Sequence, residues 1–491
     1  MQLSELFTLL FNLLVNPFLP FAIYTALGLI TPVINHLFRR KSAAYWALLN
    51  IIFLAALIVP QWTVVISTPI LSPTLWLDGI SLFFVTLFII VGFVVVIASA
   101  DYFENNPNQA TYYTLLQFAL LGMMLVAMAV DLIVMFTGWI LVAITTYTMV
   151  VIRKDDPKGI EAGVKYLIVG AVSSAAILLG ISMVFGLTGS TRLVDIVTMW
   201  ATLNPEFTPL AVLGVLLLIA GFGFKMGIVP FHMWLPDAYE GAPQPVTAFL
   251  GGSSNKAAFA ATIRVFILGF MIFRFQWATA FAILAIITMT WGNIAALSQK
   301  TLTRLLAYSA IAQAGYTIIG LATPTVLGIS GLMFHALNDG LAKTGAFIAA
   351  TVIALVLSST KLSDINGLAK RMPTTALTLS ILLLALAGVP PLSGFFSKLV
   401  LFTAAVEANL IWLAIAGVLN SAFSLAYYGW IIKRMYFDEA EDGSLETSTQ
   451  ESQKFKFVLI LLAALTIAIG IFSGIILGYI ETVVIGFLPS P

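Results

Sequence analysis

The sequence predicts an all-α polytopic membrane protein, because of its composition and the length of its apolar segments. Of its 491 residues, 60% are hydrophobic and only 9% are charged, and the mean hydropathy is +1.04. No soluble core uses that much apolar sequence, and many runs reach the ~18 apolar residues that are typical of membrane-spanning helices. The net charge of +1 argues against nucleic-acid binding.

About fourteen spans are expected along the chain. Residues 3–16 are too short to span beside the first helix and are expected at the membrane interface, and the polar segment 437–456 is expected to be a solvated loop. The spans are predicted at residues 17–38, 44–66, 76–100, 111–130, 132–152, 161–187, 209–230, 245–272, 277–298, 302–322, 326–357, 374–406, 409–433 and 455–482.

Basic residues in the short loops predict the orientation. Under this arrangement of spans, five basic loops fall on one side, whereas the opposite loops carry two arginines, Arg192 and Arg274. Because cytoplasmic loops are rich in lysine and arginine, both termini are expected outside the cytoplasm. No basic segment precedes the first apolar run, so no cleaved signal peptide is expected. The expected location is the plasma membrane of a prokaryote, or an equivalent energy-coupling membrane, with multiple passes.

Two spans contain helix breakers at membrane depth. The seventh span includes GFGFKMGIVP (221–230) and the twelfth includes GVPPLSG (388–394). In lipid such breaks survive where protein or a water-filled cavity satisfies the freed carbonyl groups, although a harmless kink is the alternative. Paired interrupted spans predict two inverted repeats with broken helices. The expected divisions are an N-terminal part (1–110), a first repeat (111–272), a second repeat (273–435) and a polar loop with the last helix (436–491).

Four lysines lie near the middles of apolar spans: Lys225, Lys256, Lys343 and Lys398. Each costs about 2.5–3.5 kcal/mol at bilayer depth, so together they cost roughly 10–14 kcal/mol. Snorkelling explains a lysine at the end of a span but not four near the middles. A functional role for these charges is therefore predicted.

The eleventh span carries the densest polar cluster, HALNDGLAKTGAF (335–347). His335, Asp339 and Lys343 are spaced i, i+4, i+8 and share one helical face. Each can take and release a proton when its pKa is suitably shifted, so this face is a candidate for proton transfer. A buried Asp339–Lys343 ion pair is the structural alternative. Glu161 and Lys165, also i, i+4, fit either a surface pair or a functional one.

No cofactor or metal is expected on this chain. Cysteine is absent, which excludes disulfides, thiolate metal sites and iron–sulfur clusters held by this chain. The three histidines, His36, His232 and His335, are scattered along the sequence. Any redox centre must therefore belong to another subunit.

These residues resemble the antiporter-like membrane subunits of respiratory complex I, multisubunit cation/proton antiporters and membrane-bound hydrogenases. The block KMGIVPFHMWLPDAYEGAPQPVTAFLGGSSNKAAFAATIR (225–264) resembles the central signature of that family. Its YEGAPQPVTAFL portion is similar to the N-type subunit of NADH-quinone oxidoreductase-like complexes, whereas HALNDGLAKTGAF is more similar to D-type and hydrogenase subunits. Further matches, over roughly residues 75–435, are LDGISLFF, EAGVKYLIVGAVSS, TLTRLLAYSAIAQAGY and GVPPLSGFFSKLVLF.

The resemblance implies a proton pathway, a polar axis in the membrane plane that is formed by the four lysines with His335 and Asp339. Lys225 matches the broken-helix lysine, Lys256 the central lysine, Lys343 with His335 the linking group, and Lys398 the terminal lysine. The family places a glutamate where this chain has Ile140. We therefore expect no carboxylate of this chain within about 4 Å of the Lys225 ammonium.

Three functions are compatible with these residues. The first is a proton-translocating membrane-arm subunit of a complex I-like, redox-driven pump. The second is a subunit of a cation/proton antiporter or an ion-pumping membrane-bound hydrogenase, in which sodium could also move. The third is a structural membrane-arm subunit that no longer pumps. The expected partners are other membrane subunits of a multisubunit redox complex, including neighbouring antiporter-like subunits, together with the lipid bilayer.

Overall fold

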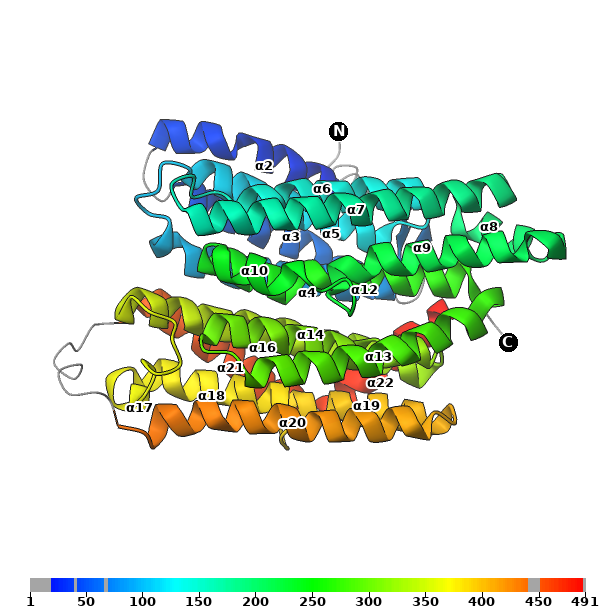
Figure 1. The fold of residues 1–491 in the computed structure, drawn as a ribbon. Coiled ribbons are helices and arrows are strands. Elements are labelled where there is room, and N and C mark those ends of the chain that lie inside the picture. The colour runs from blue at the N-terminus through cyan, green and yellow to red at the C-terminus, as the bar shows by residue number, and fades with distance from the viewer. Residues whose placement is uncertain (1–18, 39–41, 66–68, 440–450, 489–491) are drawn as a thin grey trace.

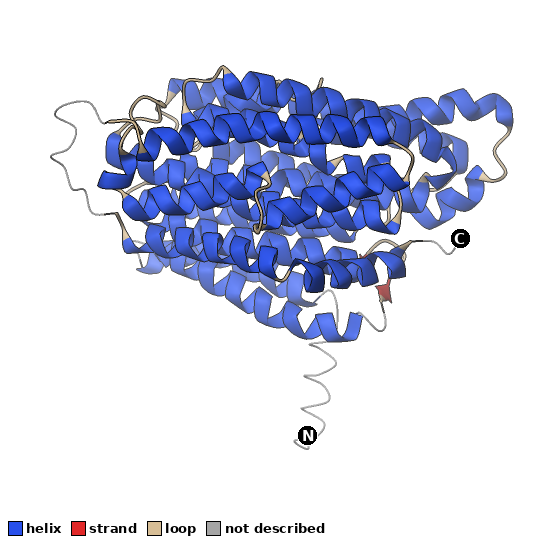
Figure 2. Ribbon diagram, turned by 90° about the horizontal axis from the view of Figure 1, so that it is seen from below, coloured by secondary structure: helices blue, strands red, loops and turns tan. Residues whose placement is uncertain are grey.

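Long helices that run roughly parallel to one another make up most of the structure, a computed structural model that describes residues 19–38, 42–65, 69–439 and 451–488 (Figures 1 and 2). The predicted interfacial segment 3–16 and most of the predicted polar loop lie outside these ranges. In Figure 1 the first half of the chain, blue to green, lies above the second half, green to red.

The first half begins with three long helices and a small hairpin. Its elements are α2 (Leu19–Phe38), α3 (Ser42–Val65), the antiparallel strands β1 (Ile70–Leu71) and β2 (Trp76–Leu77), α4 (Gly79–Tyr102), α5 (Gln109–Met128), α6 (Leu132–Val150), α7 (Pro157–Thr188), α8 (Leu193–Trp200), η1 (Pro205–Phe207), α9 (Thr208–Met226), α10 (Trp234–Gly241), α11 (Gln244–Phe249), the π-helical turn η2 (Leu250–Ser254), α12 (Asn255–Arg264) and a second π-helical turn, η3 (Val265–Gly269).

The second half contains α16, the central helix of the bundle. Its elements are η4 (Met271–Phe273), α13 (Arg274–Leu297), α14 (Leu302–Thr317), α15 (Ile319–Ala322), α16 (Val326–Leu357), α17 (Leu368–Arg371), α18 (Pro373–Ala387), α19 (Ser393–Glu407), α20 (Ile411–Tyr436), α21 (Gln453–Ile471) and α22 (Ser473–Phe487).

Among the described residues, 12 helical segments are long and apolar enough to cross a membrane, and two shorter apolar helices, α18 and α22, accompany them. The all-α polytopic class is confirmed, whereas the expected total of fourteen spans is not established by this count. The predicted span 245–272 is assembled from α11, η2, α12 and η3. The short helix α8 was not predicted; it lies within a segment that we expected to be a loop.

Both predicted breaks are present, and each follows a glycine with a left-handed backbone. Helix α9 ends at Gly227 (φ 77°) before α10, and α18 ends at Gly388 (φ 90°) before α19. Glycine adopts this conformation without the Cβ penalty of other residues, which is why it commonly ends helices. The division into two inverted repeats stays a prediction that these paired breaks support.

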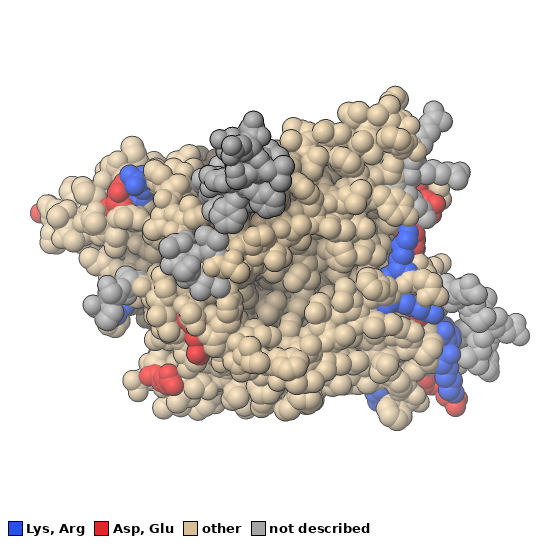
Figure 3. Space-filling view, turned by 180° about the vertical axis from the view of Figure 1, so that it is seen from behind, with Lys and Arg blue, Asp and Glu red and all other residues tan. Residues whose placement is uncertain are grey.

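The basic loops gather at one end of the bundle. Lys300 and Lys361 lie in two loops that pair through their backbones, and Arg434 donates to the carbonyl of Leu362 in the second of these loops. At the opposite end, Arg192 lies beside the N-terminus of α6. Figure 3 shows a broad uncharged belt, with most of the lysine and arginine side chains of that face gathered at its right-hand end. This arrangement is the one that the positive-inside rule predicts for a cytoplasmic end.

The core is centred on α16, which is buried along most of its length. It packs against α4 and α11 of the first half and against α14, α18, α19 and α21 of the second. Helix α16 carries His335, Asp339 and Lys343, so its position places this polar face between the two halves of the chain.

Candidate functional site

The four predicted lysines face the interior of the protein. Lys256 and Lys343 are 0% exposed, and Lys225 and Lys398 are 3% exposed. A lysine that faced lipid in the described segments would show a large exposed fraction. The expectation that these lysines avoid lipid is therefore confirmed for all four.

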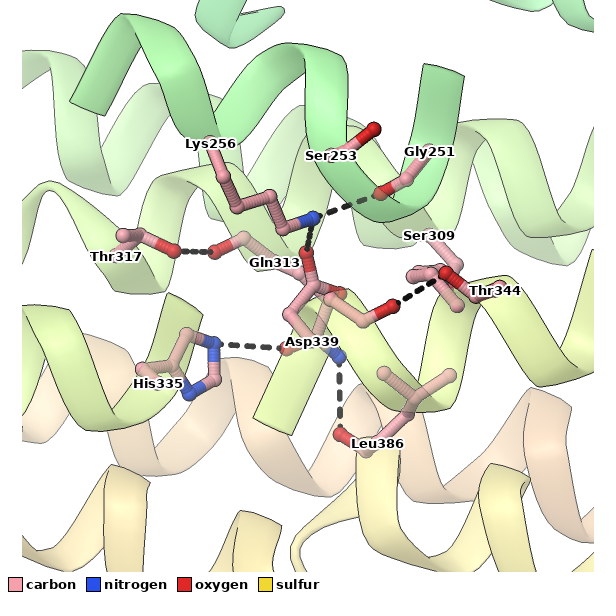
Figure 4. Close-up of polar contacts among 12 residues, drawn as sticks. Gly251, Ser253, Lys256, Ser309, Gln313, Thr317, His335, Asp339, Thr344 and Leu386 are labelled. Carbon is pink, nitrogen blue, oxygen red and sulfur yellow. Dashed lines mark hydrogen bonds and ion pairs between the residues drawn. The ribbon is translucent and has the colours of Figure 1, made fainter. Parts of the chain in front are cut away.

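Lys256 forms a buried ion pair with Asp339. Its Nζ lies 2.6 Å from Oδ2 of Asp339 and donates a second hydrogen bond of 2.7 Å to the carbonyl of Gly251 (Figure 4). The alternative of an Asp339–Lys343 pair is wrong, because Asp339 turns to the neighbouring helix α12 rather than along its own helix. Asp339 Oδ1 is buried with no hydrogen-bond partner among the described residues.

Local backbone structure brings these two helices together. The π-helical turn η2 ends two residues before Lys256, and the carbonyl of Gly251 in this turn accepts a hydrogen bond from the Lys256 ammonium. A Cβ atom added to Gly252 would overlap Oγ1 of Thr344 on α16. The glycine pair Gly251–Gly252 therefore allows the close approach of η2 to α16 that the Lys256–Asp339 pair requires.

Lys343, one helical turn beyond Asp339, belongs to a hydrogen-bonded chain. Its Nζ donates to the carbonyl of Leu306 at 3.1 Å and to Oγ of Ser309. The Ser309 hydroxyl lies 2.5 Å from that of Tyr428, which in turn accepts from Gln313 at 3.4 Å. This chain joins α16, α14 and α20.

Gln313 continues the chain to His335 and to Lys398. Its Oε1 lies 3.1 Å from Nε2 of His335 (Figure 4), and Nδ1 of His335 lies 3.0 Å from Oγ of Ser397. The Gln313 amide also donates to the carbonyl of Leu386 at 2.9 Å, and Lys398 donates to the same oxygen at 3.0 Å. Lys343, His335 and Lys398 are thus connected through Gln313.

Lys398 caps the broken helix that precedes it. Its Nζ donates to the carbonyls of Leu386 and Ala387 at the C-terminal end of α18, and to Oγ of Ser421 at 3.1 Å. Its ammonium also lies 4.5 Å from the centre of the Tyr316 ring. A cation is stabilised at this position because the last carbonyls of a helix are unpaired and carry partial negative charge.

Lys225 has different surroundings. Its Nζ donates to the hydroxyls of Tyr166 at 3.1 Å and Thr146 at 3.4 Å, and the Tyr147 ring centre is 5.9 Å away. Among the described residues no carboxylate lies within 4.0 Å of this ammonium, as expected from Ile140. Within the same residues, no hydrogen bond links Lys225 to Lys256.

The other carboxylates of the first half have roles away from Lys225. Asp131 caps the N-terminus of α6 and accepts from Thr191 at 2.6 Å, in agreement with an interfacial position. Glu161 forms a half-exposed pair with Lys165 at 2.8 Å, and Lys165 also contacts Asp237 at 2.9 Å. The exposure of both side chains therefore supports the interpretation of Glu161 and Lys165 as a surface pair.

Several residues of the site were not predicted. Gln313 and Ser309 lie in the motif TLTRLLAYSAIAQAGY but were not predicted as site residues. Two polar side chains four residues apart in an apolar span do indicate a polar helical face. Tyr166 and Tyr428 carry no such signal, because tyrosine is common in apolar spans. The remaining unpredicted pair, Asp78 with Arg264, lies at the other end of α12.

Together the polytopic helical fold, the paired helix breaks and the buried lysine row define an antiporter-like membrane subunit. The sequence matches the family described as "NADH:quinone oxidoreductase/Mrp antiporter, TM" over residues 129–424. The chain belongs to this family, and it is a multi-pass protein of the plasma membrane.

Curated relatives are N-type subunits. The chain is similar to F(420)H(2) dehydrogenase subunit N of Methanosarcina mazei, with 41% identity over 380 residues that cover 75% of this chain and 76% of the relative. It is also similar to NADH-quinone oxidoreductase subunit N of Heliobacterium modesticaldum, with 38% identity over 437 residues, covering 89% and 90%. A chain of respiratory complex I from Thermus thermophilus with bound aureothin has 27% identity and a TM-score of 0.78, covering 94% of this chain and 99% of that chain.

Proposed function

We propose that this chain is a proton-translocating membrane-arm subunit of a complex I-like, redox-driven pump. The observation that carries the proposal is the buried network of the second half, in which Lys343, His335 and Lys398 are connected through Gln313. The Lys256–Asp339 pair lies one helical turn from Lys343 on α16. Electron transfer takes place in other subunits, and the complex as a whole is the oxidoreductase.

The network supports proton transfer because hydrogen bonds through hydroxyl, amide and carbonyl groups join three titratable side chains, Lys343, His335 and Lys398. Asp339 lies one helical turn from Lys343. Asn338 and Asp339 on α16, and Ser254 and Asn255 beside Lys256, have buried polar atoms with no partner among the described residues. Such atoms in buried sites are where ordered water binds. Water at these positions would bridge the Lys256–Asp339 pair to the chain that begins at Lys343.

Loading and unloading follow from the exchange of partners. While Asp339 is paired with Lys256, its charge stabilises the ammonium of Lys256; if Asp339 turned toward Lys343, the stabilisation would move with it. A buried cation without a nearby anion releases its proton more readily than one with an anion. Movement of one carboxylate between two lysines is thus a means to drive a proton along the row.

The test uses the complex purified with this chain and reconstituted in lipid vesicles. Lys343→Met should abolish most of the proton uptake per electron transferred while the electron-transfer rate in the presence of an uncoupler is retained. Gln299→Leu, a substitution outside the network at the basic end, is the control. Full proton uptake by Lys343→Met would instead favour a structural subunit that no longer pumps.

The family name also includes antiporters, so sodium transport is a second candidate. Among the described residues no group of three or more histidine and carboxylate side chains could hold a metal ion. A row of lysines suits protons better than sodium, because an ammonium repels a cation. Uptake of labelled sodium in the same vesicles, with a stoichiometry that follows electron transfer, would support the antiporter function.

A further inference from the structure

Arg264 is a second buried cation on the helix that carries Lys256. Its side chain is 0% exposed, its Nη2 lies 2.6 Å from Oδ1 of Asp78, and its Nε donates to the carbonyl of Ala127. Asp78 is the N-cap of α4 and also accepts from the backbone of Ser81 at 2.8 Å. The guanidinium therefore ties α12 to the N-terminus of α4 and the C-terminal end of α5.

Arg264 lies between Lys256 and the end of the bundle opposite the basic loops. The N-terminus of α4 and the C-terminus of α5 are at that end, where Asp131 and Arg192 also lie. Arg264 follows Lys256 by eight residues on α12, about 12 Å along the axis at ~1.5 Å per residue, and both lie on one helical face.

Small residues line the face of α12 that joins the two cations, and the larger Phe259 and Ile263 flank it. The residue between them on the shared face is Ala260, and the helix interior is rich in alanine, with Ala257, Ala258 and Ala261. Nη1 of Arg264 and Oδ2 of Asp78 are both buried with no partner among the described residues. A proton that moved from Lys256 along this face of α12 toward the outer end would therefore meet this guanidinium and its carboxylate partner.

We propose that Arg264 is a fixed-charge barrier that prevents protons on the Lys256–Asp339 pair from escaping to the outer face. This inference rests on the proposed function. A guanidinium keeps its charge at all physiological pH values, so it cannot relay a proton as lysine can. A fixed arginine charge in a narrow polar path is a known means to exclude protons. Protons are thereby directed sideways, to Lys343, rather than outward.

The pair offers matched variants that separate charge from architecture. Arg264→Gln removes the cation, and Arg264→Lys keeps a cation of smaller size. Asp78→Asn breaks the ion pair but retains a residue that caps helices well, and leaves Arg264 charged. The double variant Asp78→Asn with Arg264→Gln removes both charges, so that no single buried charge is left to impair folding.

The experiment measures passive proton leak in vesicles that contain the assembled complex, without substrates, under an imposed potassium diffusion potential. Arg264→Gln, Arg264→Lys and the double variant should leak several times faster than the unmodified complex, because each puts a group without a permanent charge at this position, whereas Asp78→Asn should remain tight. If vesicles with Arg264→Gln and vesicles with the double variant both remain tight to protons, the barrier proposal is wrong. A leak in Asp78→Asn equal to that in Arg264→Gln would also overturn the proposal. The intact ion pair, rather than the charge of Arg264, would then be what blocks the protons. Leak is measured without turnover, so the outcome does not depend on whether the chain pumps.

Discussion

Lys256 and Asp339 are 83 residues apart in the sequence, and their charged atoms are 2.6 Å apart in the interior. Neither side chain has appreciable contact with solvent. This ion pair joins α12 of the first half to α16 of the second. Its formation makes Lys256 part of the junction between the halves as well as part of the proposed proton pathway.

The stability and the transport role of this pair are separable. Lys256→Met leaves a buried carboxylate without its cation and should lower the free energy of unfolding by about 3–5 kcal/mol. Lys256→Met combined with Asp339→Leu should recover most of that loss, since a well-packed apolar pair can replace a buried ion pair. Both variants should lose most proton pumping. Thermal unfolding of the purified complex and proton uptake in vesicles measure the two effects, and recovery of pumping in the double variant would contradict the proposed pathway.

Lys225 should matter less than the lysines of the second half. It is held by two hydroxyls, without a carboxylate within 4.0 Å and without a hydrogen-bonded link to Lys256 among the described residues. Lys225→Met should therefore reduce proton uptake per electron by a smaller fraction than Lys398→Met. Parallel measurement of the two variants at equal electron-transfer rate decides this. An equal or greater loss in Lys225→Met would show that the first half is fully coupled.

Asp237 connects the two halves at the basic end. Its carboxylate contacts Lys165 of α7 and Arg304 of α14, each at 2.9 Å. Burial opposes ionisation, but the hydrogen bonds from Lys165 and Arg304 outweigh it and lower the pKa of Asp237. Its contribution to stability is therefore present above the ordinary aspartate pKa of about 4 and is lost as the pH falls through the lower folded-state value.

Asp237→Asn should accordingly lower the thermal unfolding temperature at pH 7, and the difference from the unmodified chain should shrink in acid. The measurement is an unfolding series from neutral to acidic pH on the purified complex. Asp155→Asn, in an exposed position at the same end, is a suitable control. A difference that grows in acid would contradict the assignment.

Absence of cysteine allows a direct test of orientation. Single cysteines at the exposed positions Asp155 and Lys361, both at the basic end, should be labelled by an impermeant reagent only from the cytoplasmic side. A cysteine at the exposed Glu206, at the other end, should be labelled only from outside. The reverse pattern would invert the predicted topology.

The sequence predicts which charges lie in the protein interior better than it predicts their partners. A lysine in an apolar run can be recognised from the sequence alone, so Lys225, Lys256, Lys343 and Lys398 could be identified directly. The partner of Lys256 could not, because Asp339 is equally near to Lys343 by helical spacing and only the packing of α12 on α16 decides between them. The π-helical turn η2 was also missed, since LGGSS reads as a continuation of the helix.

The Gly251 carbonyl gives the central lysine a second attachment that does not titrate. In the proposed exchange of partners the Asp339 carboxylate moves away from Lys256, whereas this peptide oxygen, 2.7 Å from Lys256 Nζ, has no charge to lose. The lysine side chain can thus remain extended in one place while its electrostatic environment changes. In the proposed pathway this second attachment would give each cycle the same starting geometry, so that successive protons would meet an acceptor in the same position.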